Sequence, residues 1–532
     1  MTENTGSHKG FFQKIHIPTL VLCLGCVLTA SFGHRGWGTL VCREWAVLSM
    51  LLTSVWGLFR VLGNKRMTLC EDDVAKTFFL IGIIESAIAF LQLAKVLASC
   101  NSLFRFTGSF TNPSMLAILL SMCILIGLYY ARQSRGKDRV KWVALTSLQV
   151  IFLVLCTSRM GIMAVLCSHF ILFVKPATNE HLLWKAHRKV VFPVLILVPL
   201  LIALYYVKND SANGRILIWT NCIHMIMDKP ITGWGTDGFD AHYMPYQAAY
   251  FMQHPGSAFS ILADNISHPF NEYLLFAVKY GLPGLTLLLF ALGGLLKILA
   301  GSNSNHKKLF ICICMVIGIC AMFSYPYKMP VIWVVSTYII CQAITSCNNH
   351  RMARATFMSF LILILLFKSM YRIRDEWKWT SLMDNPTQES SEKILQEYHR
   401  LYKGLHTNSY FLYNYGAVLH HQGKHCLSNK VLDECARKYN DYNVQMLIAD
   451  NYRELGKHRE AIGRFSYAGH MIPCRFLPLY YKMETYKRAG DIKNACRMAK
   501  EILQKPVKIK NSPAIEEIRR KATQLTEAHG NE

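Results

Sequence analysis

Residues 1–371 contain one apolar run after another, each about twenty residues long. A run of that length crosses the hydrocarbon core of a bilayer as an α-helix, because a helix satisfies its own backbone polar groups. The sequence therefore predicts an all-α, polytopic membrane protein with about eleven transmembrane helices. These expected spans lie at 15–33, 44–62, 77–98, 113–131, 142–157, 160–175, 189–207, 270–298, 309–325, 330–346 and 355–371.

The polarity of the chain changes at Arg372, which predicts two domains. We expect a transmembrane domain over residues 1–371 and a soluble helical tail over 372–532. One long polar loop, 208–267, interrupts the apolar runs. Polar loops of that length in a membrane protein usually carry a function.

Positive charge predicts how the chain crosses the membrane. Short basic loops, such as Asn64–Arg66 and Lys307–Lys308, fall on one side if the N-terminus is cytoplasmic, as the positive-inside rule requires. The loop 208–267 and the tail then lie on the opposite side. No nucleic-acid motif accompanies the formal net charge of +25, so we expect no nucleic-acid partner.

The tail contains a repeat. Gly423, Gly456 and Gly490 lie 33 and 34 residues apart, and a tyrosine precedes each of the last two by four residues. This spacing resembles the tetratricopeptide repeat, a pair of antiparallel helices, over about 408–505. Stacked helix pairs present a concave surface, so we expect a binding scaffold for a protein partner.

Four of the 18 cysteines lie in the tail: Cys426, Cys435, Cys474 and Cys496. In an extracytoplasmic tail, Cys426 and Cys435 or another pair of them are candidates for a disulfide. The sequence leaves open whether any of them pair.

Arg215 opens the first helix expected in the long loop, Ile216–Met227, which ends before Lys229-Pro230. Apolar residues, Trp219 among them, lie on one face of this helix, which suits a helix lying on a membrane surface. Arg215 is either part of that anchor or a ligand for an anionic headgroup or substrate, because a guanidinium fork fits pyrophosphate. Further on, Gly233 and Gly235 predict a tight turn whose backbone approaches another group closely.

His268 precedes Pro269 and the start of the next expected span. The N-terminus of that helix favours an anion, and a histidine beside it can accept a proton from a hydroxyl near neutral pH. The alternative is a histidine that only caps the helix. His242 and His254, in the same loop, are rivals for the role.

Two more arginines fall on the same predicted side of the membrane. Arg159 lies in the short turn Ser158–Gly161, where it either contacts lipid headgroups or serves a function. Arg105 precedes Asn112-Pro113, a pattern typical of a helix start. Among the few acids within the spans, Glu85 is a candidate for a proton relay.

Taken together, these residues resemble the superfamily of O-antigen ligases and O-antigen polymerases, which are bacterial inner-membrane glycosyltransferases. The resemblance covers about residues 15–345. The matching motifs are Arg105-Phe-x-Gly-x-Phe-x-Asn112, Ser158-Arg159-x-Gly161, Gly214-Arg215-x-x-x-Trp219, Pro230-x-x-Gly233-x-Gly235, His268-x-x-Asn271-x-Tyr273-Leu274 and Gly281-Leu282-Pro283-Gly284. The family's loop more often reads His-x-His-Asn, so here its first histidine is missing or shifted.

The resemblance implies a membrane fold of the GT-C type. Such enzymes take a glycan from undecaprenyl pyrophosphate on the periplasmic face, without a metal or a nucleotide sugar. The resemblance assigns His268 as the catalytic residue and Arg159 and Arg215 as ligands of the pyrophosphate, with Arg105 as a further positive group. The residues expected to support them are Asn112, Trp219, Gly233, Gly235 and Asn271.

We therefore expect a transferase that needs neither a metal nor another cofactor. Its partners are the lipid-linked glycan donor, membrane lipids and an acceptor, for which lipid A-core is preferred because polymerases less often carry such a tail. A growing glycan and a protein hydroxyl are the alternative acceptors. More distant alternatives are a transporter of a polar lipid and a noncatalytic envelope scaffold.

Overall fold

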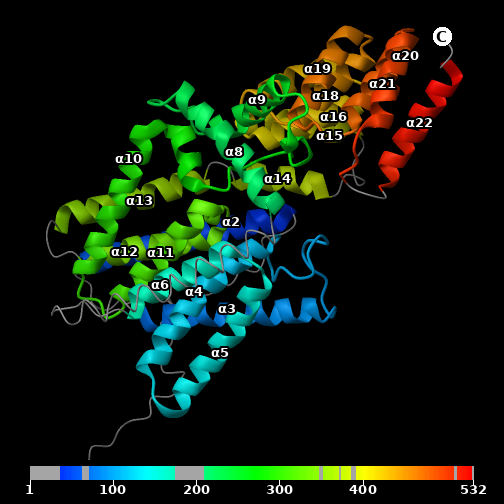
Figure 1. Cartoon of the computed structure of the whole chain (residues 1–532). Coiled ribbons are helices and arrows are strands. Elements are labelled where there is room, and N and C mark those ends of the chain that lie inside the picture. The colour runs from blue at the N-terminus through cyan, green and yellow to red at the C-terminus, as the bar shows by residue number, and fades with distance from the viewer. Residues whose placement is uncertain are drawn as a thin grey trace, which may run out of the picture. The chain divides into compact units, whose positions relative to one another are not determined.

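The computed structural model describes residues 36–62, 71–173, 209–346, 351–370, 373–384, 391–508 and 512–529. Within these ranges the protein forms twenty α-helices, two short 3-10 helices and no strands (Figure 1). The all-α prediction is confirmed for this part of the chain. The chain packs as two compact units, unit 1 within Met1–Leu204 and Phe290–Ile373, and unit 2 within Tyr205–Leu289 and Arg374–Glu532.

Unit 1 consists of the apolar helices. They are α2 (Gly36–Val61), α3 (Glu71–Leu93), α4 (Pro113–Gln133), α5 (Gly136–Leu155), α6 (Arg159–Phe173), α11 (Lys307–Phe323), α12 (Pro330–Ser346) and α13 (Arg351–Met370), with the short helix η2 (Pro326–Lys328). Helix α10 (Glu272–Gly301) begins in unit 2 and ends in unit 1.

Helices lie where nine of the eleven spans are expected, whereas the expected spans 15–33 and 189–207 lie outside the described residues. Three of the described helices, α3, α4 and α10, are long and apolar enough to cross a membrane. Shorter apolar helices lie at Ala46–Phe59, Pro330–Ser346 and Met352–Ile364. The number of eleven crossings stays a prediction.

Helices α4 and α10 differ in what surrounds them. The middle of α4, from Leu116 to Ile126, is buried on all sides by other helices of unit 1. On α10, by contrast, Leu287 and Phe290 are 71% and 76% exposed. Large apolar side chains exposed along a helix mark a surface that contacts either lipid or another protein surface.

Unit 2 combines the long loop with the tail. The loop contains α8 (Asn209–Asp228), α9 (Gly238–Gln253) and the short helix η1 (Ala258–Ile261). Helix α8 confirms the helix expected over Ile216–Met227 and extends it by two turns at its start. The tail helices are α14 (Ile373–Asp384), α15 (Ser391–Leu405), α16 (Ser409–His421), α17 (His425–Ala436), α18 (Tyr442–Glu454), α19 (His458–Met471), α20 (Leu477–Arg488), α21 (Ile492–Gln504) and α22 (Pro513–His529).

The tail helices α16 to α21 follow one another as three helix pairs (Figure 1). Gly423, Gly456 and Gly490 lie in the turns within these pairs, with φ of 69°, 72° and 78°. Glycine adopts this left-handed conformation without the strain that a Cβ atom adds. The pairs occupy the region in which the repeat is expected, and their assignment to the tetratricopeptide family stays a prediction.

The four tail cysteines are free thiols in the structure. Cys426 and Cys435 both lie on α17, nine residues apart. Nine residues of α-helix rise by about 13 Å, far more than a disulfide spans. The pairing of Cys426 with Cys435 was therefore a wrong candidate.

Candidate active site

The turn that leads into α10 fixes the position of His268. Asn271 caps the helix, because its Oδ1 accepts hydrogen bonds from the backbone N–H groups of Tyr273 and Leu274, each at 3.0 Å. The residue before it, Phe270, has a φ of +56°, which is uncommon for a side chain of this size. Such strained turns are concentrated at functional sites.

His268 is only 5% exposed, and both of its ring nitrogens face protein groups. Nδ1 accepts a hydrogen bond from the Phe270 N–H at 2.9 Å. The proton of the neutral imidazole therefore lies on Nε2, which is 3.4 Å from Oε2 of Glu272. His268 and Glu272 thus form a pair that can hold and pass on a proton, with the carboxylate as the more exposed partner.

Helix α8 brings Arg215 and Trp219 to the same turn. The Trp219 indole N–H donates to the carbonyl oxygen of Pro269 at 2.9 Å. One helical turn earlier, the Arg215 guanidinium lies 5.5 Å from the centre of the Phe270 ring. The two ends of the long loop, which carry Arg215 and His268, therefore meet in unit 2.

Gly233 and Gly235 lie in a turn that packs against a break in α10. The break is at Gly281, where φ is 70° and ψ is −179°. It leaves the carbonyls of Val278 and Lys279 to accept hydrogen bonds from the N–H groups of Trp234 and Gly235, both at 2.9 Å. The close partner of this turn is thus the backbone of α10.

The approach of the two backbones requires glycine on both sides. A Cβ atom on Gly233 would lie 2.4 Å from the Lys279 carbonyl oxygen, and one on Gly281 would lie 2.2 Å from the Ile231 carbonyl oxygen. Nothing lies within 4 Å of a Cβ atom built on Gly235, whose φ of 85° still favours glycine.

In unit 1, two buried polar side chains hold the loop that carries Arg105. Gln92 of α3 accepts the N–H groups of Thr107 and Gly108, each at 2.9 Å, and donates to the Gly108 carbonyl at 2.8 Å. Glu85 accepts the Ser109 N–H at 2.9 Å and the Ser109 hydroxyl at 2.5 Å. Glu85, a candidate proton relay from the sequence, is therefore part of the structure that shapes this loop.

The other unit 1 residues of interest lie at helix starts. Asn112 caps α4, as expected, through a bond from the Ser114 N–H at 2.8 Å, and its amide donates to the Tyr325 hydroxyl at 3.2 Å. Arg159 is the half-buried first residue of α6 and follows Thr157, whose φ is +49°. Arg105 itself is exposed. Unit 1 thus carries Arg105, Asn112 and Arg159.

Residues 96–289 match the family model described as O-Antigen ligase. The match contains every residue that the motifs predict for the site, from Arg105 to Asn271. This match supports the assignment of residues 96–289 to the O-antigen ligase superfamily. None of the curated proteins compared with this chain matches it.

Within this O-antigen ligase domain, the family pattern His-x-His-Asn can be placed on the structure through the capping residue Asn271. Counting back from Asn271 puts His268 at the first histidine and Phe270 at the second. By this count phenylalanine stands at the second position of the pattern, and its ring packs beside Arg215. How the family pattern aligns with this chain stays a prediction.

The two rival histidines of the domain have other surroundings. His242 lies against the Trp234 ring, with centroids 4.4 Å apart, and burial together with the charge of Lys229 lowers the pKa of His242. His254 is exposed, stacks on Tyr250 and has Nδ1 3.0 Å from the Tyr250 carbonyl oxygen. The contact of His242 fits a packing role, and that of His254 fits a role at the end of α9.

The sequence did not indicate two features. One is Glu272. An acid in the first turn of a helix is common because it favours the helix dipole, so the sequence provides no reason to expect Glu272 beside His268. The other is a cluster outside the O-antigen ligase match, in which His306 lies 3.1 Å from both Glu71 and Asp72. Burial lowers the pKa of His306, but these carboxylates outweigh it and raise that pKa.

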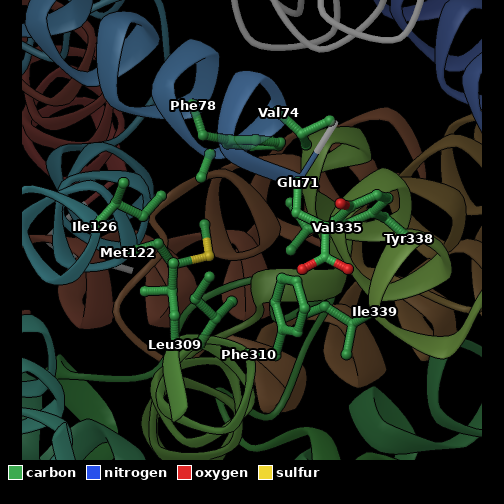
Figure 2. Close-up of a pocket in the computed structure, with 12 residues that line it drawn as sticks. Glu71, Val74, Phe78, Met122, Ile126, Leu309, Phe310, Val335, Tyr338 and Ile339 are labelled. Carbon is green, nitrogen blue, oxygen red and sulfur yellow. The ribbon is translucent and has the colours of Figure 1, made fainter. Parts of the chain in front are cut away.

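A hollow in unit 1 lies beside this cluster, and Figure 2 shows Glu71 at it among apolar side chains. Phe78 of α3, Phe310 of α11 and Tyr338 of α12 line it together with other apolar residues. None of the predicted site residues lines this hollow. Apart from Glu71 and Tyr338 its lining residues are apolar, which suits helix packing better than the binding of a sugar.

Proposed function

We propose that the protein transfers a glycan from undecaprenyl pyrophosphate to an acceptor hydroxyl on the periplasmic face of a bacterial inner membrane. The O-antigen ligase match supports glycan transfer at the level of the family. The observation that carries the finer proposal is the meeting of Arg215 and the His268–Glu272 pair at the start of α10. Helix α10 is also a candidate membrane span, which supports a site that a lipid-linked donor can reach.

The donor presents a pyrophosphate, and the site offers matching positive charge. The Arg215 guanidinium can donate two parallel hydrogen bonds to phosphate oxygens. The N-terminus of α10 adds the partial positive charge of its backbone N–H groups. These groups stabilise the charge that develops on the departing pyrophosphate. Arg159 and Arg105 belong to unit 1, and their role as pyrophosphate ligands stays a prediction from the sequence.

In the transfer step, the acceptor oxygen forms a new bond to the anomeric carbon of the donor sugar. The bond from that carbon to the phosphate oxygen breaks, and undecaprenyl pyrophosphate leaves with the bonding electrons. The hydroxyl proton goes to the His268–Glu272 pair, in which Glu272 is the more exposed acceptor. Solvent then takes the proton from the pair.

For the acceptor, we favour lipid A-core. The test uses the purified protein in detergent with undecaprenyl-pyrophosphate glycan and, in separate reactions, lipid A-core, a free glycan or an unmodified protein. A mass-shifted lipid A-core is the expected product. A shifted glycan or protein instead would make the enzyme a polymerase or a protein O-oligosaccharyltransferase. Absence of product with all three acceptors would reject the proposal.

Contacts within unit 2 constrain the membrane topology. The amide of Gln247, in the long loop, donates to the Met471 carbonyl in the tail at 2.6 Å. The loop and the tail must therefore lie on the same side of the membrane. Four helices, α10 to α13, separate them along the chain, and one predicted crossing by each returns the chain to its starting side. This number fits the contact, and we propose the periplasmic face because the short basic loops lie on the other predicted side.

We expect the exposed thiol of Cys426 on α17 to react with a membrane-impermeant maleimide added to intact spheroplasts. Comparison with Cys426→Ser assigns the label to the tail. Labelling of Cys426 only in inverted membrane vesicles would place the tail in the cytoplasm and contradict the topology.

A further inference from the structure

The tail contacts the chain just before His268 at three places. The Cys474 thiol lies 3.5 Å from the Ala263 carbonyl oxygen, and Arg475 forms an ion pair with Asp264 at 3.0 Å. The Asn265 amide donates to the Asp441 carboxylate at 2.6 Å. Residues 263–265, which end three residues before His268, are thus held by the start of α18 and the turn after α19.

Gln247 of α9 links the same elements from the inside. It is fully buried, and its amide donates both to the Met471 carbonyl at 2.6 Å and to the Asp264 carbonyl at 3.1 Å. Its oxygen accepts the Tyr243 hydroxyl at 2.9 Å. A buried amide with all these partners fixes the position of the loop against the tail. Breaking any of these hydrogen bonds would leave a buried polar group unpaired.

An apolar core joins the two parts around Gln247. Ile218, Phe239 and Tyr243 of the loop share one buried cluster with Ala468 and Met471 of the tail. Ile218 lies on α8 between Arg215 and Trp219, the two residues that contact the turn after His268. The tail therefore packs against the helix that brings Arg215 to the site.

We propose that the tail is a positioning element of the transferase, which holds residues 263–271 and helix α8 so that His268 and Arg215 keep their geometry. This inference rests on the proposed function and adds to it a role for the tail inside the enzyme itself. Displacement of a reacting group by about 1 Å costs on the order of a hundredfold in rate. Because Arg215 and His268 act mainly on the charge and the proton of the transition state, loosening this junction lowers kcat more than it changes the KM for the donor.

The test replaces Gln247 by methionine, which has a similar volume but cannot make these hydrogen bonds. Arg488→Ala is the control, because Arg488 pairs with Glu454 at 3.0 Å within the tail. We expect Gln247→Met to lower kcat at least tenfold, to change the donor KM less than twofold and to speed amide hydrogen exchange over residues 263–271. The control is expected to leave all three quantities at their wild-type values.

Asn265→Ala is a milder second variant, for use if Gln247→Met fails to fold. The exchange measurement does not depend on activity, so it tests the junction even if the wild type transfers no glycan. Wild-type exchange over 263–271 in Gln247→Met or in Asn265→Ala would overturn the positioning role. An increase in the donor KM at unchanged kcat would also overturn the positioning role.

Discussion

Replacement of His268 by asparagine is expected to lower glycan transfer by roughly a hundred- to ten-thousandfold, the range that a general acid–base group contributes. Asparagine can still accept the Phe270 N–H, as Nδ1 of His268 does at 2.9 Å, because its side chain favours this local bond. It lacks the Nε2–H group that faces Glu272. The variant therefore removes the proposed proton transfer and keeps the hydrogen bond that shapes the turn.

Transfer rate and thermal unfolding in detergent are the quantities to measure. The melting temperature of His268→Asn is expected to stay close to that of the wild type. His254→Ala is the matched control. His254 lies in the same loop, is exposed and contacts Tyr250 at the end of α9. Wild-type transfer in His268→Asn would remove His268 from the proposed step.

Glu272→Gln distinguishes the two members of the pair. If Glu272 takes the hydroxyl proton, this variant loses transfer to a similar extent, since an amide cannot accept the proton. Because both ring nitrogens of the neutral His268 face other groups, retained activity in Glu272→Gln would contradict the proposed proton acceptor.

Replacement of Gly281 by alanine is expected to destabilise the protein by roughly 2–4 kcal/mol and to abolish transfer in the fraction that remains folded. The backbone at Gly281, with φ of 70° and ψ of −179°, is in a region that only glycine adopts readily. The new Cβ atom would also lie 2.2 Å from the Ile231 carbonyl oxygen. Relief of this clash would separate the Pro230–Gly235 turn from α10.

The control for this prediction is Gly293→Ala, in the same helix. Nothing lies within 4 Å of a Cβ atom at Gly293, and its backbone is helical. Because alanine is the better helix former, we expect the control to unfold at the wild-type temperature or slightly above it. Equal melting temperatures for Gly281→Ala and the wild type would contradict the account of the broken helix.

Features set by neighbouring residues could be predicted from the sequence. The helix start at Asn112-Pro113 is one of them, because the cap and the proline act within a single turn. The glycine turns of the tail are another, since their left-handed backbone follows from residue type and spacing. The helix before Lys229-Pro230 was predicted for the same reason.

Features that join distant parts of the chain could not be predicted. The sequence indicated that Gly233 allows a close approach, but the partner is the break at Gly281, 48 residues later. The tail was expected to be a scaffold for another protein, whereas Gln247 joins it to the long loop of the same chain across 224 residues. Such contacts depend on how whole helices pack, which no local pattern specifies.

The release of undecaprenyl pyrophosphate tests the central claim most directly, because this product is the same for every acceptor. Wild type and Arg215→Ala, purified in detergent, are supplied with undecaprenyl-pyrophosphate glycan, with and without lipid A-core. We predict release by the wild type that depends on the acceptor and equals the glycan transferred, with release at least a hundredfold slower in Arg215→Ala. Equal release from the two proteins, or none from folded wild type with lipid A-core, glycan or protein as acceptor, would contradict the account.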